Sequence, residues 1–199
     1  MKIVVLVSGG IDSALMMSMF KKNGHEIFPL FINYNHLAFE REWKACQQIC
    51  NKLSLKPFKM DILGFGELPS GLTNASLDIY EQAFLPTRNL TFVTLGAAYA
   101  YSISCSVVAI GLLVNHTFPD QTKDFVEKAE ISISTALGKK IHILTPLIDL
   151  DKCDVLNLAK EYDLEPITYF CHSGSDEPCG KCISCRERKS AEKTLSKIK

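Results

Sequence analysis

The sequence predicts an α/β fold built on a doubly wound, mostly parallel sheet. Its 199 residues, 47% of them hydrophobic, are enough to bury one sizeable core. The segment KIVVLV at 2–7 is apolar throughout, which is typical of a parallel strand covered on both faces. Similar strands alternate along the chain with segments whose apolar residues recur every three or four positions. This alternation is the pattern of a parallel sheet with helices on both faces.

The first part of the chain contains three expected strands and two expected helices. In chain order they are a strand at 2–7, a helix at 12–23, a strand at 26–34, a helix at 39–55 and a strand at 56–62. Gly24 suits the position just after the end of the first helix. The second helix is indicated by apolar residues from Phe39 to Leu53 at helical steps, which form a core-facing stripe.

The second part opens with a long irregular connection. From Leu63 to Pro86 the periodicity fails and Gly, Pro, Ser and Asn accumulate, so we expect a functional loop and a candidate lid. A helix rich in small residues, able to pack closely on the sheet, follows at 88–104. The remaining expected elements are a strand at 106–113, a helix at 121–137, a strand at 140–147 and a helix at 151–162 capped by Asp149 or Asp151.

Charge and hydropathy narrow the class of partner. Twenty-two basic residues balance twenty-two acidic ones, so no overall field favours bulk nucleic acid or an anionic membrane surface. The chain shows no signal-peptide pattern and no run of roughly 18 apolar residues, the length that a membrane span needs. We therefore expect a cytoplasmic protein with small-molecule or protein partners, no membrane partner and no direct nucleic-acid binding.

Four loops follow the expected strands and should converge on one site. In a doubly wound sheet, ligands bind outside the carboxyl ends of the strands. The segments at that edge are 8–13, 33–36, 112–120 and 146–152.

The first of these loops reads SGGIDS at 8–13 and has the residues of an anion site. Gly9 and Gly10 allow a tight turn and close approach to a phosphate, Ser8 and Ser13 add hydroxyl donors, and a helix start adds N–H groups. Asp12 fits either as a cap in the first turn or as a carboxylate near phosphate-bound Mg²⁺. A bare Gly-Gly would favour a plain tight turn, but the whole string favours a ligand, although the lysine of a P-loop is missing.

A second cluster, in FCHSGSDEPCGKCISCRERKSA at 170–191, has metal-ligand spacing. Its cysteines are Cys171, Cys179, Cys182 and Cys185, in a C-x7-C-x2-C-x2-C arrangement. Four thiolates at these spacings suit tetrahedral Zn²⁺, which would stabilise a short tail; an iron–sulfur cluster is the alternative, and disulfides are disfavoured. We expect a main domain at 1–165 and a zinc-binding segment at 166–199. The other cysteines, Cys46, Cys50, Cys105 and Cys153, fit ordinary core positions.

The string SGGIDS resembles the PP-loop of the N-type ATP pyrophosphatases, whose fold is HUP-like. These enzymes release pyrophosphate and transfer AMP, which accounts for the missing P-loop lysine. Together with PTRNLTF (86–92), TPLIDLDKCDVLNLAKEYDL (145–164) and CGKCISCRER (179–188), it makes nearly the whole chain resemble the QueC family, the 7-cyano-7-deazaguanine synthases. The resemblance implies a ligase that adenylates the carboxylate of 7-carboxy-7-deazaguanine with ATP, forms an amide with ammonia and converts the amide to a nitrile.

The resemblance also assigns roles to residues. Arg88, Asn89 and Asp120 would bind the deazaguanine, and catalysis would depend on Asp12, Lys152 and Arg88. Ordinary structural roles stay open: Lys152 as a surface lysine near a helix start, and Arg88 and Asn89 as residues of a helix start. The implied cofactors are structural Zn²⁺ and Mg²⁺, with ATP as co-substrate, and the implied assembly is a homodimer. The residues that would bind ATP are Ser8, Gly9, Gly10, Asp12, Ser13 and Lys152.

Some positions depart from the family pattern. The family's D-Y-G-Q loop reads Asn33-Tyr34-Asn35-His36 here, and the cysteine of its P-D-C segment is Gln121. His36 is either a general base or, more simply, a hydrogen-bonded loop histidine.

These departures leave three functions open. The chain is a nitrile-forming synthase, a QueC-like paralogue of the kind found in antiphage operons that joins the deazaguanine to a protein amine, or an inactive nucleotide-binding module. A tRNA-modifying enzyme of the PP-loop superfamily is disfavoured, because the sequence shows no basic segment suited to binding RNA.

Overall fold

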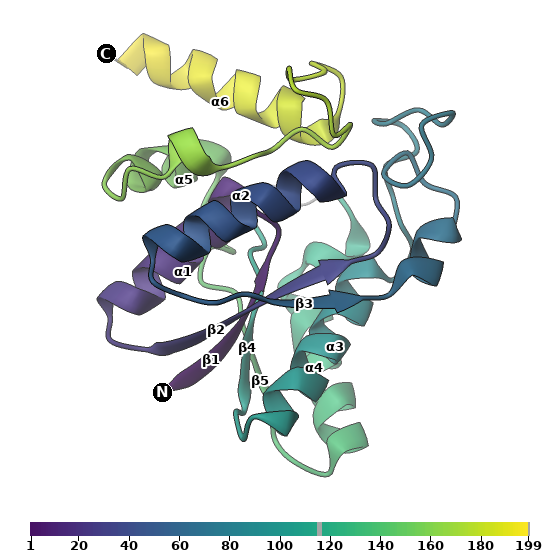
Figure 1. Cartoon of the computed structure of the whole chain (residues 1–199), viewed down its shortest axis with the longest axis vertical. Coiled ribbons are helices and arrows are strands. Elements are labelled where there is room, and N and C mark those ends of the chain that lie inside the picture. The colour runs from purple at the N-terminus through teal and green to yellow at the C-terminus, as the bar shows by residue number, and fades with distance from the viewer. Residues whose placement is uncertain (115–116, 199) are drawn as a thin grey trace.

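The computed structural model describes residues 1–114 and 117–198 and confirms the α/β architecture (Figure 1). Within this part of the chain, every strand pair of the sheet is parallel, and the strand order is β3-β2-β1-β4-β5. The strands are β1 (Lys2–Val7), β2 (Glu26–Asn33), β3 (Phe58–Asp61), β4 (Val107–Ala109) and β5 (His142–Leu144).

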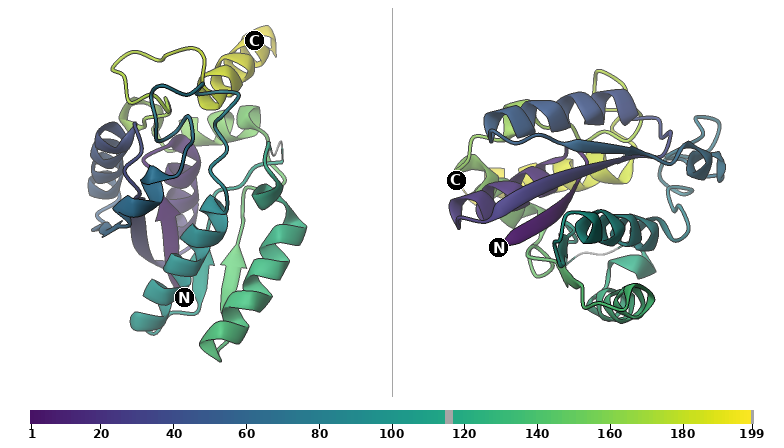
Figure 2. Two further views of the ribbon diagram at one scale, coloured as in Figure 1. Left: turned by 90° about the vertical axis from the view of Figure 1, so that its right-hand side faces the viewer. Right: turned by 60° about the horizontal axis from the view of Figure 1, so that its bottom comes forward.

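Helices cover both faces of the sheet. Helices α1 and α2 lie on one face and α3 and α4 on the other (Figures 1 and 2). Helix α5 packs on α1, and α6 packs on α5. The bounds are α1 (Ile11–Lys22), α2 (Phe39–Lys52), α3 (Arg88–Ser102), α4 (Lys123–Leu137), α5 (Lys152–Lys160) and α6 (Ile183–Ile198), with short 3₁₀ turns η1 (Leu63–Glu67), η2 (Pro119–Gln121) and η3 (Glu165–Ile167).

Packing in the core explains two sequence features. Ile3, Val4 and Val5 of β1 are fully buried, which is why this central strand is apolar at consecutive positions. Gly96 in α3 lies against β4, where an added Cβ would stand 2.9 Å from Val108 Cγ1. The small residues of α3 therefore bring the helix close to the sheet, as predicted.

The structure also corrects the expected bounds. The strands predicted at 106–113 and 140–147 are only three residues long, because the chain leaves the sheet soon after Ala109 and Leu144. The last inter-strand bond there runs from Ile110 N to Leu144 O, at 3.0 Å. Helix α6 was not predicted at all, since its sequence is mostly polar and charged.

The strand order fixes where a ligand can enter. The chain runs from β1 to β2 and β3 on one side and then returns to place β4 on the other side of β1. The loops after β1 and β4 therefore leave the sheet in opposite directions, and an opening forms between them.

Helices long and apolar enough to cross a bilayer are absent from residues 1–114 and 117–198.

Candidate active site

A cavity of about 280 Å³ opens at the carboxyl ends of the strands. Walls come from the loop after β1, the end of β2, the start of α3, the segment after β4, the start of α5 and the C-terminal tail. Of the residues predicted to act on ATP or substrate, those in its wall are Ser8, Asp12, Ser13, Arg88, Asn89 and Lys152. The four predicted loops thus contribute to one cavity, although residues 115 and 116 of the third lie outside the described part of the chain.

The loop after β1 has a backbone that only glycine allows at one position. Gly9 has a φ of +76°, and a Cβ there would stand 2.3 Å from the carbonyl oxygen of Glu42. The Ser8 hydroxyl accepts a bond from the Gly10 N–H at 3.3 Å, and the Ser13 hydroxyl donates to the Gly10 carbonyl at 3.0 Å. No side chain caps α1, so the N–H groups of its first turn are available to an anion.

Asp12 and Lys152 form an ion pair in the cavity wall. Lys152 Nζ lies 2.7 Å and 2.8 Å from the two carboxylate oxygens of Asp12, and the lysine side chain is only 15% exposed. Lys152 is the first residue of α5, where the helix dipole disfavours a cation, and the Asp12 carboxylate offsets that cost. Asp151 rather than Asp149 caps α5, since its side chain accepts a bond from Asp154 N at 2.9 Å.

The start of α3 brings Arg88 and Asn89 into the same cavity. Asn89 is buried, its N–H donates to Asp120 Oδ2 at 3.2 Å, and its side-chain amide donates to the Asp120 carbonyl at 3.0 Å. Asp120 itself does not line the cavity. In this structure it holds the start of α3, and its neighbour Gln121 lies in the cavity wall instead.

The loop after β2 keeps its turn despite the departures from the family pattern. Asn33 donates to Asp61 Oδ1 at 2.7 Å and accepts a bond from Asn35 N at 3.0 Å, which closes the turn. The same Asn33 hydrogen bond lowers the pKa of Asp61. Asn35 has a φ of +61°, a conformation that glycine adopts freely and that Asn tolerates better than most residues. Two asparagines thus replace the acid and the glycine that the family pattern has here.

His36 is the hydrogen-bonded loop histidine of the simpler alternative. Its Nε2 lies 2.9 Å from Glu42 Oε2, and its ring stacks on Tyr34 with centroids 4.2 Å apart. Both rings are buried and line the cavity. Burial raises the pKa of Tyr34 to about 12, against the opposing positive charge of the neighbouring Arg88. The phenol is therefore protonated at neutral pH.

The tail supplies a wall of the cavity that the sequence analysis missed. Tyr169 N donates to the Gly9 carbonyl at 3.0 Å, and His172, Ser184 and Glu187 line the cavity. Burial lowers the pKa of His172 to about 4 and raises that of Glu187. His172, Ser184 and Glu187 lie within the segment 170–191 that the cysteines single out, but that segment was interpreted only as a metal site, and nothing in its spacing indicates that it also lines the cavity.

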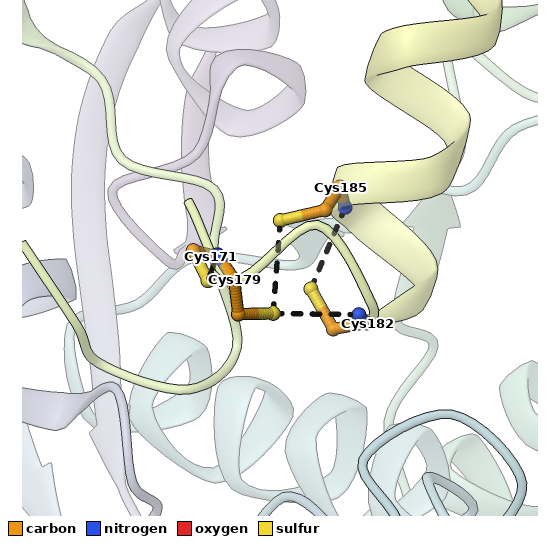
Figure 3. Close-up of side chains that lie close together, drawn as sticks. All are labelled: Cys171, Cys179, Cys182 and Cys185. Atoms are coloured by element: carbon orange, nitrogen blue, oxygen red, sulfur yellow. Dashed lines mark hydrogen bonds between the residues drawn. The ribbon is translucent and has the colours of Figure 1, made fainter. Parts of the chain in front are cut away.

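The four predicted ligand cysteines come together in the tail (Figure 3). Their Sγ atoms all lie within 4.8 Å of one another, and those of Cys179 and Cys185 are 3.9 Å apart. A tetrahedral ion with Zn–S bonds of about 2.3 Å holds its sulfurs about 3.8 Å apart, so the cluster fits one mononuclear ion. An iron–sulfur core would stand between the thiolates and needs them wider apart. The remaining cysteines are free and pack in the core, as predicted.

Backbone N–H groups orient three of these sulfur atoms. Cys179 N donates to Cys171 Sγ at 3.3 Å, Cys182 N to Cys179 Sγ at 3.4 Å and Cys185 N to Cys182 Sγ at 3.4 Å. Such N–H groups favour the thiolate form that a metal requires.

Solved structures with low sequence identity share this fold. A 4-thiouridine synthetase, solved with RNA and bound ATP, matches 99% of this chain and 51% of its own with a TM-score of 0.60 and 17% identity. An NMN synthetase from Francisella tularensis matches 98% of this chain and 76% of its own with a TM-score of 0.59 and 17% identity.

Sequence relatives have a higher sequence identity and align over more than nine-tenths of both chains. A 7-cyano-7-deazaguanine synthase from Campylobacter curvus is 34% identical over 203 residues, which are 94% of this chain and 91% of that protein. One from Nitratiruptor is 34% identical over 215 residues and covers 100% of this chain and 97% of its own. The sequence model of the family described as "Queuosine biosynthesis protein QueC" matches residues 2–196. The chain therefore belongs to the QueC family.

Proposed function

We propose that this protein adenylates the carboxylate of 7-carboxy-7-deazaguanine with ATP, transfers the acyl group to ammonia, and converts the resulting amide to the nitrile with a second ATP. The observation that carries the proposal is the Asp12–Lys152 pair beside the uncapped start of α1, in a cavity that Arg88 also lines. Family membership and the names of the relatives support the choice of substrate.

In the proposed first step, groups with positive charge or N–H and O–H donors act on the phosphates. In the first step a carboxylate oxygen attacks the α-phosphorus and pyrophosphate leaves, so negative charge grows where phosphates lie. The first-turn N–H groups of α1, with the Ser8 and Ser13 hydroxyls, would hold the phosphates, and Lys152 would neutralise the leaving pyrophosphate. Mg²⁺ bound with ATP would supply further positive charge, and the Asp12 carboxylate would hold it.

The later steps complete the balance. Ammonia attacks the acyl carbon, the bond to AMP breaks, and the amide remains. The amide oxygen then attacks the α-phosphorus of a second ATP, and pyrophosphate leaves. The bond between the acyl carbon and this oxygen then breaks to release AMP, the nitrogen loses two protons, and the nitrile remains. One nitrile therefore requires two ATP and yields two AMP and two pyrophosphate.

The cysteine cluster has a structural role in this proposal. One Zn²⁺ would be held by the four thiolates and would fix the tail that forms a cavity wall.

Mass spectrometry of the protein incubated with Mg²⁺–ATP and 7-carboxy-7-deazaguanine, with and without ammonia, tests the proposal. We expect nitrile with two AMP per product. Lys152→Gln should lower the rate of adenylation about 10²–10³-fold, because it removes a charge that stabilises the leaving group. Lys123→Gln is the matched control, since Lys123 pairs with Asp149 on the surface outside the cavity. No AMP from the wild-type protein would instead indicate an inactive nucleotide-binding module.

A second candidate function is conjugation of the deazaguanine to a protein amine. It is favoured by the loop after β2 and by Gln121, where this chain departs from the family pattern around the cavity while keeping the PP-loop residues. In that case the same experiment would yield AMP without nitrile, and the deazaguanine mass would appear on a polypeptide.

A further inference from the structure

Tyr34 is a cavity residue to which the proposed reaction has so far assigned no role. It belongs to a row of groups that runs from the partly exposed Glu42 through the buried His36 and Tyr34 to the partly exposed Arg88. The contacts in this row are the Glu42–His36 bond at 2.9 Å and the His36–Tyr34 stack, whose ring planes are inclined by 14°. Phe92 adds a third ring, with its centroid 5.4 Å from that of Tyr34.

An acidic residue and a basic residue stand at the two ends of this row. The Glu42 side chain is 16% exposed and pairs with His36, whose side chain is 4% exposed. Arg88 lies at the other end and is also part of the cavity wall. Tyr34 lies next to this guanidinium, and stacking on the His36 ring holds its own ring in place.

The chemistry at the Arg88 end matches a carboxylate. A guanidinium only donates hydrogen bonds, so beside it the Tyr34 oxygen is at most an acceptor, and the O–H proton stays available to a ligand. A protonated phenol next to a guanidinium offers two donors to one anion, and hydrogen bonds of this kind are strengthened by the charge.

We propose that Tyr34 is a further substrate-binding residue: its hydroxyl and the Arg88 guanidinium together bind the carboxylate that is adenylated, while Glu42 and His36 hold the Tyr34 ring. This inference rests on the proposed function for the identity of the substrate. His36 is a positioning residue in it, because it acts only through Tyr34.

The first test is Tyr34→Phe, which removes the hydroxyl and keeps the stacked ring. We expect KM for 7-carboxy-7-deazaguanine in pyrophosphate exchange to rise about tenfold, as for loss of one hydrogen bond to a charged group, and KM for ATP to stay within twofold. Tyr99→Phe is the matched control, since Tyr99 stacks on Phe58 outside the cavity. An unchanged KM for the deazaguanine, or a rise in KM for ATP instead, would overturn the inference; the latter would place the hydroxyl on the phosphates.

The second test asks whether His36 acts through Tyr34. His36→Gln keeps a donor for Glu42 and removes the ring that stacks on Tyr34. We expect it to raise the same KM, and we expect the double variant with Tyr34→Phe to be no worse than Tyr34→Phe alone. Additive effects in the double variant would contradict the positioning role.

Calorimetry without ATP separates this inference from the proposed function. Wild-type protein should bind 7-carboxy-7-deazaguanine more tightly than Tyr34→Phe does, and both should bind 7-deazaguanine, which lacks the carboxylate, equally. Absence of substrate-dependent pyrophosphate exchange in the wild type would refute the proposed function, whereas equal binding of the carboxylate by both proteins would refute the role of Tyr34.

Discussion

Gly9 shows how the backbone conformation of one residue shapes the loop after β1. Its positive φ turns the chain from β1 into α1, and the absence of a Cβ lets the loop lie against the Glu42 carbonyl at the start of α2. The same loop accepts the Tyr169 N–H through its own carbonyl. A side chain at Gly9 would clash with the backbone of α2 and push this loop away from that helix.

We therefore predict that Gly9→Ala is more destabilising than an alanine at another glycine of positive φ. Gly24 has a φ of +73° with nothing within 4 Å of an added Cβ, so Gly24→Ala should cost about 1 kcal/mol of unfolding free energy. Gly9→Ala adds a clash with backbone and should cost at least about 2 kcal/mol more, with weaker ATP binding. Urea unfolding of both variants checks this, and equal losses would show that the loop relaxes freely.

The raised pKa of Tyr34 predicts a loss of stability at alkaline pH. Because the folded value of about 12 lies above the unfolded value of about 10, the unfolded chain releases this proton first as the pH rises. The stabilisation is complete below pH 10 and is lost between pH 10 and 12, up to about 3 kcal/mol. Urea unfolding between pH 8 and 11.5 should show a flatter dependence for Tyr34→Phe than for wild type and Tyr99→Phe.

At the scale of elements, the C-terminal tail carries the cysteine cluster and also forms part of the cavity wall. Ile79 of the long loop 63–86 packs against the cysteine cluster, and Leu72 and Ala83 of the same loop line the cavity. Arg186 of α6 lies over the Tyr80 ring at 3.7 Å. The loop and the tail therefore support each other on one side of the cavity, and movement of the loop as a lid stays a prediction.

Loss of the metal should consequently abolish the adenylation activity. We expect about one zinc per purified chain, and we expect Cys179→Ser to lose the metal, pyrophosphate exchange and the hydrogen-exchange protection of residues 166–198. Elemental analysis, a pyrophosphate-exchange assay and amide hydrogen exchange measure these three losses in turn. Cys153→Ser, outside the cluster, is the control and should keep its metal; full activity of metal-free protein would contradict the structural role.

The elements themselves were predicted with uneven success. Five strands and five helices were predicted from apolar runs, apolar periodicity and cap residues, because most of these elements bury apolar side chains at a characteristic spacing. Strand ends were overestimated near Ile110, where apolar residues continue into the cavity wall and not into the sheet. Helix α6 was not predicted, because it buries little apolar surface; Ala191 is its buried residue in the main core.

At the scale of the whole molecule, the tail and the rest of the chain share one core. Ala191 of α6 is buried with the residues of the sheet and of α5. Arg188 connects α6 to Glu165 at 3.6 Å and lies over the Phe170 ring. The boundary expected at 165 therefore runs through a packed region of the structure.

We predict that the metal-loaded protein unfolds as one unit. Trp43, the single tryptophan, lies in α2 and reports on the sheet and its helices, whereas far-ultraviolet circular dichroism reports on all helices, including α6. The two urea transitions should coincide. A separate early change in the dichroism would show that residues 166–199 fold independently.

The sequence by itself determined the α/β class, the glycine turn that leads from β1 into α1 and the four clustered cysteines. Each depends on local chemistry: apolar periodicity, a glycine turn before a helix, and ligands spaced closely along the chain. Only the tertiary structure decided that Lys152 meets Asp12, 140 residues away, that Asp120 supports Asn89 and stays out of the cavity wall, and that the tail closes the site. The physical reason is that these contacts depend on which strand ends are neighbours, and β4 lies beside β1 through long-range packing that no spacing along the chain records.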